Sequence, residues 1–418
     1  MSRFRPRRLI GATVGALVIL AIGIYGPATL LGPLPVVTAT LVTPTDGADN
    51  LSPPVLPTGG ASAVAAFDAT ALDASAPMAV AGTTDALPMA SIAKIVTALV
   101  VLEAKPLDVG RTGPTVAITT TDYQDYIDYA NADARTVVVF PGENWTEREL
   151  LQAMILGSSN NHADTLARWA FGSVDAYLEA ANTWLAKNGL PATHVVDATG
   201  LHDASVGTAT DLAHLAGIAA AHPVIAELLA NPSDALVGQR GVDNTTAYLP
   251  EEGITGISRS YTDAAGVCFL FTAQVGTGES AFTFSGAFIN EPDYNILTTD
   301  LTALMESARA GVSELPILTQ GDAYATFEAP WGDTASGIVG VSRTRVGWQA
   351  AIPGAATVTL DTFSTGRAGK AVGRVSIEAA GDNVSAPLVL NRAINDPGPG
   401  WRLLNPFPMI AALVESGK

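Results

Sequence analysis

The chain has 418 residues, enough for two or three folded units. Hydrophobic residues make up 48% and charged residues 15%, which excludes a disordered chain and indicates that part of the chain meets a membrane. With 22 basic against 40 acidic residues, the protein is a poor candidate for binding nucleic acid. A single cysteine, Cys268, and five histidines without metal-binding spacing predict neither a disulfide nor a metal site.

The N-terminus has the pattern of a membrane signal-anchor. Four arginines within residues 3–8 precede 24 uncharged residues, 9–32. At about 1.5 Å per residue this stretch forms roughly 36 Å of helix, enough to cross a bilayer. The arginines favour a cytoplasmic N-terminus, so we expect a single-pass protein of the cell membrane with the bulk of the chain outside. Residues 37–39 also form a passable cleavage site, so a cleaved signal peptide is the second interpretation.

The next segments change from extended to regular structure. Residues 41–60 are rich in proline and threonine and predict a linker. Residues 61–67 and 78–80 are short apolar runs that predict a pair of strands. Residues 91–103 carry apolar side chains at helical spacing and predict a helix.

Helices dominate the middle of the chain. Thr146 followed by Glu149 predicts a capping box at the start of a helix over residues 147–156. Further helices are predicted over 161–171, 174–187, 210–221 and 301–309, and neighbouring strands over 266–274 and 280–289. This mixture indicates a sheet with helices packed on it.

After Pro316 the pattern changes to alternating Val and Thr residues broken by Gly and Pro. This alternation predicts a small all-β domain over residues 316–400. Residues 401–418 contain an apolar run and predict a docked tail, with a second membrane contact as the other interpretation.

The first candidate for chemistry is Ser91 with Lys94. Residues i and i+3 of a helix lie on one face, so the hydroxyl and the amine can touch. A serine is a weak nucleophile until a base removes its proton, and a desolvated lysine can be that base. The start of the helix adds backbone N–H groups for a developing oxyanion. A capping serine followed by a surface lysine would give the same short pattern.

A second polar pair, Ser158 and Asn160, lies between two predicted helices. A hydroxyl and an amide two residues apart in a loop can face one cleft, where one transfers a proton and the other binds a substrate amide. The S-x-N pattern is common in turns and is weak evidence by itself. It indicates a catalytic site only because it follows S-x-x-K in the sequence.

In this order the motifs resemble those of the penicillin-binding serine D-alanyl-D-alanine carboxypeptidases, peptidase family S11. The surrounding phrases match as well, over residues 88–102, 157–164, 197–201, 208–212 and 261–266. The resemblance implies an α+β, β-lactamase/transpeptidase-like domain, with an antiparallel sheet, helices on both faces and a helical subdomain, followed by a C-terminal all-β domain. It also implies Ser91 as nucleophile, Lys94 as base, peptidoglycan stem peptides as substrate, β-lactams as covalent inhibitors and no cofactor.

The resemblance fails at the third motif, K-T-G. Ser258, Arg259 and Ser260 occupy its three positions, before Tyr261, whose backbone N–H is implied in the oxyanion hole. In the family the lysine supplies positive charge, the threonine binds the substrate carboxylate and the glycine allows a close approach. Ser258 removes the cation and Ser260 adds a side chain. Strand alternation turns Arg259 away from the cleft unless the strand slips by one residue.

We therefore expect a membrane-anchored serine carboxypeptidase with slow turnover. The alternative is a pseudoenzyme that binds peptidoglycan or regulates cell-wall synthesis, and β-lactamase activity would differ only in deacylation. His162 and residues 244–246 are expected to be structural, and Cys268 a small buried hydrophobe. The predicted organisation is an anchor (1–40), a linker (41–60), a carboxypeptidase-like domain (61–312), a β domain (316–400) and a tail (401–418).

Overall fold

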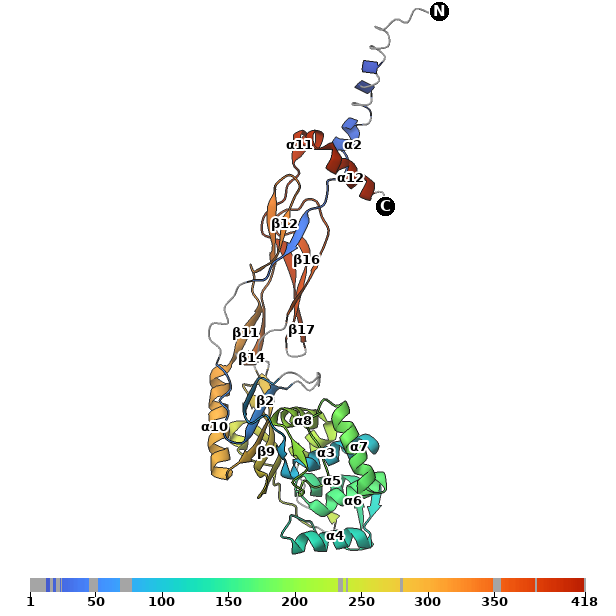
Figure 1. The fold of residues 1–418 in the computed structure, drawn as a ribbon, viewed down its shortest axis with the longest axis vertical. Helices are drawn as coiled ribbons and strands as arrows, with labels where there is room; N and C mark the ends of the chain where they lie inside the picture. The colour runs from blue at the N-terminus through green and yellow to red at the C-terminus, as the bar shows by residue number, and fades with distance from the viewer. Residues whose placement is uncertain are drawn as a thin grey trace, which may run out of the picture.

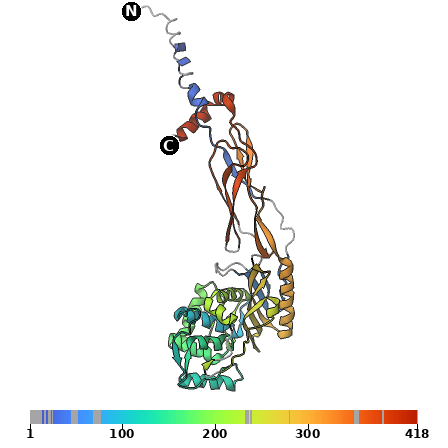
Figure 2. The ribbon, with the colours of Figure 1, turned by 180° about the vertical axis from the view of Figure 1, so that it is seen from behind.

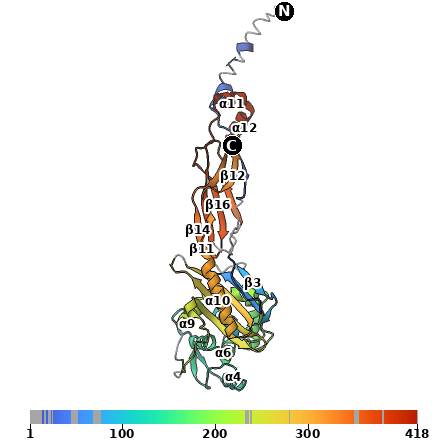
Figure 3. The same cartoon turned by 90° about the vertical axis from the view of Figure 1, so that its left-hand side faces the viewer.

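The computed structural model describes residues 13–15, 18–19, 23, 25–44, 52–67, 77–231, 236–237, 240–278, 281–348, 355–379 and 382–416. The molecule is elongated, with a body of helices and sheet at one end and a β domain in the middle (Figure 1). A small group of helices and the N-terminus lie at the other end. The views from behind and from the side show the same order (Figures 2 and 3).

A five-stranded antiparallel sheet forms the centre of the body, in the order β3-β2-β10-β9-β8. Its strands are β2 (Ala61–Ala66), β3 (Ala79–Gly82), β8 (Ile254–Thr262), β9 (Gly266–Val275) and β10 (Phe282–Glu291). The predicted strand pair is confirmed as β2 and β3, and the two later predicted strands as β9 and β10.

Helices cover both faces of this sheet. Helix α8 (Ala209–Ala221) packs on one face and α10 (Tyr294–Gly311) on the other. Because strand side chains alternate, the sheet contributes to two separate cores. One core contains Leu212 and Leu270, and the other contains Leu301 and Phe271. The antiparallel sheet with helices on both faces is therefore as expected.

A helical subdomain lies between the first and third motifs. A short 3₁₀ turn, η2 (Ala90–Ile92), leads into α3, and four more helices follow. These are α3 (Ala93–Ala104), α4 (Thr120–Asn131), α5 (Glu147–Ile155), α6 (Asn160–Phe171) and α7 (Val174–Lys187). The predicted capping box is present, because Thr146 accepts from the backbone of Glu149 while the Glu149 carboxylate accepts from that of Thr146. Helix α9 (Pro223–Ala230) and the short strand pairs β4/β7 (Leu87–Pro88, Val206–Gly207) and β5/β6 (Thr115–Ala117, Asn144–Thr146) complete the body.

The β domain takes in more of the chain than predicted. Its six-stranded sheet has the order β1-β12-β13-β17-β16-β15, and β11 pairs with β14 beside it. The strands are β1 (Thr38–Leu41), β11 (Val312–Leu318), β12 (Ala323–Glu328), β13 (Thr334–Val339), β14 (Arg343–Trp348), β15 (Ala356–Leu360), β16 (Ala371–Ala379) and β17 (Asp382–Leu390).

Strand β1 corrects the predicted boundary between anchor and linker at residue 41. Thr38 pairs with Glu328 and Leu41 with Ala325, which makes the N-terminal segment an edge strand of the C-terminal domain. Next to β1, the Val37 N–H donates to the Phe363 carbonyl at 2.9 Å, which adds a second backbone contact between this segment and the β domain. Sequence reasoning missed this strand because its partner lies almost 300 residues away.

Three short helices gather at the far end: α2 (Gly26–Leu30), α11 (Gly398–Leu404) and α12 (Pro406–Ser416). The predicted docked tail thus forms two helices. Among the described residues no single helix is long and apolar enough to cross a membrane, and the α8–α9 pair that passes by length and composition is bent by 83°. Ten of the 24 residues of the predicted spanning segment, 9–32, lie outside the described residues.

Candidate active site

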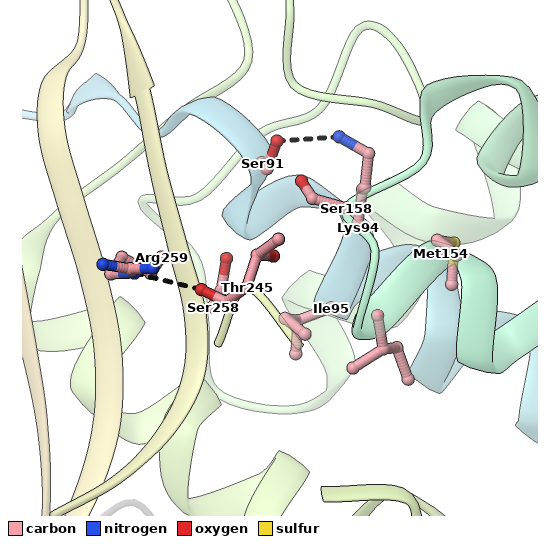
Figure 4. A pocket seen from close by; sticks show the side chains of 9 residues that line it. Ser91, Lys94, Ile95, Met154, Ser158, Thr245, Ser258 and Arg259 are labelled. Atoms are coloured by element: carbon pink, nitrogen blue, oxygen red, sulfur yellow. Dashed lines mark hydrogen bonds between the residues drawn. The ribbon is translucent and has the colours of Figure 1, made fainter. Parts of the chain in front are cut away.

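The site is centred on Ser91 and Lys94, which lie at the junction of η2 and α3. The Lys94 Nζ donates to the Ser91 Oγ at 2.7 Å (Figure 4). It also donates to the Thr199 carbonyl at 2.9 Å. Ala90, just before the serine, has a φ of 46°, which is rare for a residue with a side chain. The turn that carries Ser91 is therefore held in a strained conformation next to the base.

Burial sets the protonation of Lys94. The side chain is only 2% exposed, and loss of water lowers the pKa of the amine to about 7. The carboxylates of Asp197 and Asp164 oppose this shift, and the charge of Arg135 adds to it. A large fraction of Lys94 is therefore neutral near pH 7, as a general base requires.

The loop that follows Asp197 holds the second hydrogen bond of Lys94 in place. The Asp197 carboxylate accepts from the hydroxyls of Thr199 and Ser205 and from the backbone of Leu201. Gly200 has a φ of 78°, and a Cβ on it would lie 1.8 Å from the Ala90 carbonyl oxygen. Only glycine fits here, so this turn packs directly against the strained turn of Ser91.

The second motif lies on the opposite wall. Ser158 has a φ of 53° and lines the same cleft as Ser91 and Lys94 (Figure 4). Asn160 is buried at the start of α6, where its Nδ2 and its backbone N–H both donate to the Arg135 carbonyl at 2.9 Å. Its Oδ1 has no hydrogen-bond partner within the described chain. That oxygen is the one buried acceptor of the motif left for another donor.

His162, expected to be structural, is buried beside this motif rather than on the surface. Its ring lies 4.7 Å from that of Trp145, and its Nδ1 is 2.8 Å from the Ser159 Oγ. Burial lowers the pKa of His162 to about 3, so that the imidazole is neutral. The residue supports the loop that presents Ser158.

The third wall is β8, where Ser258, Arg259 and Ser260 pair with Leu270, Phe269 and Cys268 of β9. The register shifts between Gly256 and Ser258, before the motif. Ser258 and Arg259 both belong to the lining of the cleft, and the Arg259 guanidinium lies across the strand from Ser91 (Figure 4).

Arg259 is engaged on that far side. Its guanidinium lies 4.9 Å from the centre of the Tyr248 ring and 5.4 Å from that of Tyr294. Its Nε also donates to the Thr245 carbonyl at 3.0 Å. Arg259 thus ties β8 to the segment before it and to α10.

Ser260 and Tyr261 complete the strand. Ser260 is buried, and its Oγ has no hydrogen-bond partner among the described residues. Tyr261 is 54% exposed, and its hydroxyl donates to Asp263. The structure therefore brings Ser91, Lys94, Ser158, Ser258 and Arg259 to one cleft, whereas Asn160 is buried and is not part of its lining.

A family model for D-alanyl-D-alanine carboxypeptidases of peptidase family S11 matches residues 64–281. The chain belongs to this family. The matched range contains all three motif positions, so the departure at Ser258–Ser260 lies inside a carboxypeptidase domain.

Individual relatives agree with the family. The D-alanyl-D-alanine carboxypeptidase DacB2 of Mycobacterium tuberculosis is 31% identical over 196 residues, which cover 45% of this chain and 63% of the relative. A D-alanyl-D-alanine endopeptidase of Escherichia coli is 27% identical over 211 residues, 48% of this chain and 64% of that protein. The chain thus spans less than two thirds of the length of these curated relatives.

Solved structures confirm the carboxypeptidase fold. A D-alanyl-D-alanine carboxypeptidase from Mycobacterium tuberculosis superposes with a TM-score of 0.51 at 27% identity, covering 64% of this chain and 96% of that one. Penicillin-binding protein 5 from Haemophilus influenzae, at 18% identity, shows the same fold with a TM-score of 0.57 over 83% of this chain and 100% of that one.

Two site features of this carboxypeptidase family member were not predicted. Thr245, expected to be structural, does support the fold, since its Oγ1 donates to the Leu156 carbonyl at 2.9 Å, but it also lines the cleft. Asp164 accepts a 2.7 Å hydrogen bond from the Tyr129 hydroxyl, and burial raises its pKa to about 6. The only sequence signal for a role of Asp164 in the site is its position four residues after Asn160 on α6.

No group of metal-binding side chains occurs in the part of the chain that the structure describes.

Proposed function

We propose that this protein is a serine D-alanyl-D-alanine carboxypeptidase that acts on peptidoglycan stem peptides through an acyl-enzyme. The observation that carries the proposal is the 2.7 Å hydrogen bond between a buried Lys94 amine, with a pKa of about 7, and the Ser91 hydroxyl. A serine paired with a neutral amine at a strained turn is an activated nucleophile.

The reaction then follows from the geometry. Ser91 Oγ attacks the carbonyl carbon of the penultimate D-Ala while Lys94 Nζ takes the hydroxyl proton. The oxyanion is stabilised by the backbone N–H groups of Ser91 and, by family analogy, Tyr261. The C–N bond breaks, and the proton passes to the amine of the departing D-Ala through the cleft that Ser158 lines. Water then attacks the ester carbonyl while Lys94 accepts its proton, the C–O bond to Ser91 breaks, and Lys94 returns the proton to Ser91 Oγ.

The altered third motif makes this enzyme slow. The cleft has Ser258 where the family has a lysine, and the guanidinium of Arg259, which also belongs to the cleft lining, lies 4.9 Å from the centre of the Tyr248 ring. Losing one charge-assisted contact to the substrate carboxylate costs about 1.5–3 kcal/mol, or roughly tenfold to a few hundredfold in kcat/KM.

A pseudoenzyme that binds peptidoglycan or regulates cell-wall synthesis is the second candidate. The altered third motif favours this candidate. Ser258 removes the cation of the motif, and the side chain of Ser260, which has no hydrogen-bond partner among the described residues, stands where the family's glycine allows a close approach of the substrate. In that case the cleft would bind stem peptides without efficient hydrolysis.

A fluorescent penicillin tests these functions. The full-length protein in detergent should form a covalent adduct on Ser91, located by mass spectrometry, and Ser91→Ala should form none. Release of D-Ala from a stem peptide would establish the carboxypeptidase, whereas an adduct without release would favour the pseudoenzyme. An intact, folded protein that forms no adduct after prolonged incubation contradicts the proposed nucleophile.

We also propose that the protein is anchored in the cell membrane with residues after 40 on the cell-wall side. The support is the arginine-rich start and the 24 uncharged residues that follow it. This placement would put the cleft in the compartment that holds peptidoglycan.

A further inference from the structure

A second pocket lies in the helical subdomain, apart from the cleft of Ser91. It has a volume of about 420 Å³, and its walls come from β5, the start of α4 and the end of α6. Its lining includes Thr115, Ala117, Thr121, Arg168 and Trp169. These five residues are not part of the lining of the Ser91 cleft, so the two sites are separate. We call this site the distal pocket.

The charged groups of the distal pocket are already paired. The Nη2 of Arg168 donates to the Asp122 Oδ1 at 2.8 Å and also to the Asp125 carboxylate. Both oxygens of Asp122 are engaged, since Oδ1 also accepts from the Thr165 hydroxyl and Oδ2 accepts from Thr119. The described lining therefore offers neither a free cation for an anionic ligand nor an open carboxylate for a metal ion. A neutral ligand suits this pocket best.

The hydrogen-bonding groups that remain free in the distal pocket are uncharged. β5 is an edge strand, because its sheet has two strands. The Ile118 N–H, next to β5, donates to the Glu143 carbonyl on the β6 side. Backbone groups of successive strand residues point to alternate sides, so Thr115 and Ala117 direct theirs away from β6. The Thr121 hydroxyl also makes no hydrogen bond to the described residues.

Trp169 gives the distal pocket an apolar wall. Its indole is half-buried, and the Lys105 ammonium lies 5.7 Å from the ring centre. An aromatic wall beside hydroxyl and backbone amide groups suits a ligand that is apolar on one face and polar at its rim. A pyranose ring has this character, and an acetamido substituent adds one N–H and one C=O, which complement a free strand edge.

A peptide could also pair with a strand edge, but this edge is short. β5 has three residues, of which two direct their backbone groups outward. Strand addition draws its affinity from a row of main-chain hydrogen bonds, and two residues supply few of them. The distal pocket therefore fits an N-acetylated sugar better than a peptide.

The distal pocket lies within reach of a stem peptide held at Ser91. Asn160, Asp164 and Arg168 follow one another at four-residue spacing, so they share one face of α6. From Asn160, in the second motif, to Arg168 the helix rises by about 12 Å. An extended chain of four to five residues spans at most about 13–18 Å. A stem peptide with its C-terminal D-Ala at Ser91 can thus place its other end at this pocket.

The surroundings of the distal pocket agree with this path. The Tyr129 hydroxyl of α4 donates to Asp164 at 2.7 Å, so polar side chains continue from the second motif toward Arg168. Helix α4 lies at the end of the molecule opposite to the N-terminus (Figure 1). A long polymer can therefore approach the pocket without meeting the β domain.

We infer that the distal pocket binds the N-acetylated sugar to which the stem peptide is attached, N-acetylmuramic acid in peptidoglycan. The inference rests on the proposed function, because it requires the C-terminus of that peptide to lie in the cleft of Ser91. The carboxyl group of this sugar is consumed in the link to the peptide, so the ligand is neutral, as the paired charges of the pocket require. Its acetamido group faces the edge of β5, and its ring lies against the Trp169 indole.

Two ligands that differ only at the N-terminus of the peptide test this assignment. One is a stem peptide that carries N-acetylmuramic acid, and the other is the same peptide with an acetyl group in its place. Calorimetric titration measures the binding of each to the full-length Ser91→Ala protein in detergent. The sugar-bearing peptide should bind at least about tenfold more tightly, as expected for two or more added hydrogen bonds.

Substitutions in the distal pocket should remove this preference. Thr121→Val deletes one hydroxyl and should reduce the preference about threefold to tenfold. Trp169→Ala should abolish it, and Trp169→Phe, which keeps an aromatic wall, should retain most of it. Thr120→Val is the matched control, because Thr120 is exposed on the same helix and does not line the pocket.

Equal affinities for the two ligands would overturn the inference. A loss of affinity for both ligands in Trp169→Ala would overturn it as well, because the peptide itself would then occupy the pocket. If Trp169→Ala does not fold, as judged from its melting temperature, Thr121→Val and Thr120→Val decide the question. Equal preferences in these two variants would contradict a role for the pocket.

Release of D-Ala separates this inference from the proposed function. In an active enzyme, the pocket variants should raise KM for the sugar-bearing peptide and leave kcat unchanged. A protein that releases D-Ala from both ligands with equal kcat/KM is a carboxypeptidase without a sugar site. A protein that releases none, yet prefers the sugar-bearing peptide, keeps the sugar site and contradicts the carboxypeptidase.

Discussion

The amine of Lys94 should control the pH dependence of acylation. Its pKa is lowered to about 7 by burial, so the neutral, basic form is scarce at low pH and dominant above pH 8. The rate of penicillin acylation should therefore rise about tenfold per pH unit below pH 7 and level off above it. Stopped-flow acylation from pH 5 to 9 measures this profile. A rate that is flat across pH 7 would show that Lys94 is not the base.

A substitution of Arg135 tests the role of Lys94 as the base a second time, because the positive charge of Arg135 helps to lower the pKa of Lys94. Arg135→Ala should raise that pKa, so that the acid limb of the acylation profile moves to higher pH. Arg111→Ala, an exposed arginine of the same body, serves as the control and should leave the limb in place. A loss of rate without any shift of the limb would contradict this electrostatic role.

Restoring the missing cation is the direct test of the third motif. Ser258→Lys places an amine in the cleft beside Ser91, and kcat/KM on a D-Ala-D-Ala peptide should rise at least about tenfold. Thr255→Lys, at an exposed position of the same strand, controls for net charge. If Ser258→Lys has no effect while Arg259→Ala abolishes peptide binding, the carboxylate is bound by Arg259 and the in-register interpretation of β8 is wrong.

Much of the site could be predicted because its residues lie close together in the sequence. Ser91 and Lys94 occupy one helical face, whereas Arg259, which strand alternation predicted to point away from the cleft, is among the residues that line it. Thr245 was assigned only its structural role, and Asp164 was missed, because each lies at the site only through packing. A local sequence pattern does not predict which carboxylate will lie near a buried amine in the folded protein.

Strand β1 carries a prediction at the level of elements. A chain beginning at residue 42 lacks this edge strand and the Val37 contact, whereas one beginning at residue 33 keeps both. The shorter chain should be less stable by at least about 2 kcal/mol, a fall of roughly 8–16 °C in Tm for a unit of about 100 residues. Calorimetry of the β-domain transition measures the difference. Equal Tm values would show that β1 contributes little.

Several helices with an apolar face were predicted well, whereas a polar helix and the apolar helix α9 (Pro223–Ala230) were missed. Helices α5 to α8 match their predicted ranges within two residues. Helix α4 was missed because its sequence, TTDYQDYIDYAN, is polar and its clearest signal is the capping box formed by Thr119 and Asp122. Helices α11 and α12 are interrupted by proline and asparagine, which favour turns in the absence of the tertiary contact with α2.

The whole molecule should fractionate with membranes. Intact cells treated with external protease should lose the part after residue 40 and keep only a short N-terminal fragment. An epitope tag at each end, followed by immunoblotting, distinguishes the fragments, and a cytoplasmic protein serves as the lysis control. Recovery of most of the protein as a soluble species that starts near residue 40 would show that the N-terminal segment is cleaved.

The pairing of β1 with β12 has a consequence for biogenesis. Thr40 and Thr326 are 286 positions apart, so the first strand to be synthesised must wait for a much later part of the chain before it can pair. Domains fold as they emerge, so the carboxypeptidase body can form while β1 is still unpaired. Contacts of the segment that follows β1 then bring this strand closer to its partner. The Val55 N–H donates to the Ser307 hydroxyl, and the Trp348 indole donates to the Ser52 carbonyl. A destabilised carboxypeptidase body would therefore delay closure of the β sheet and leave an unpaired strand edge open to aggregation.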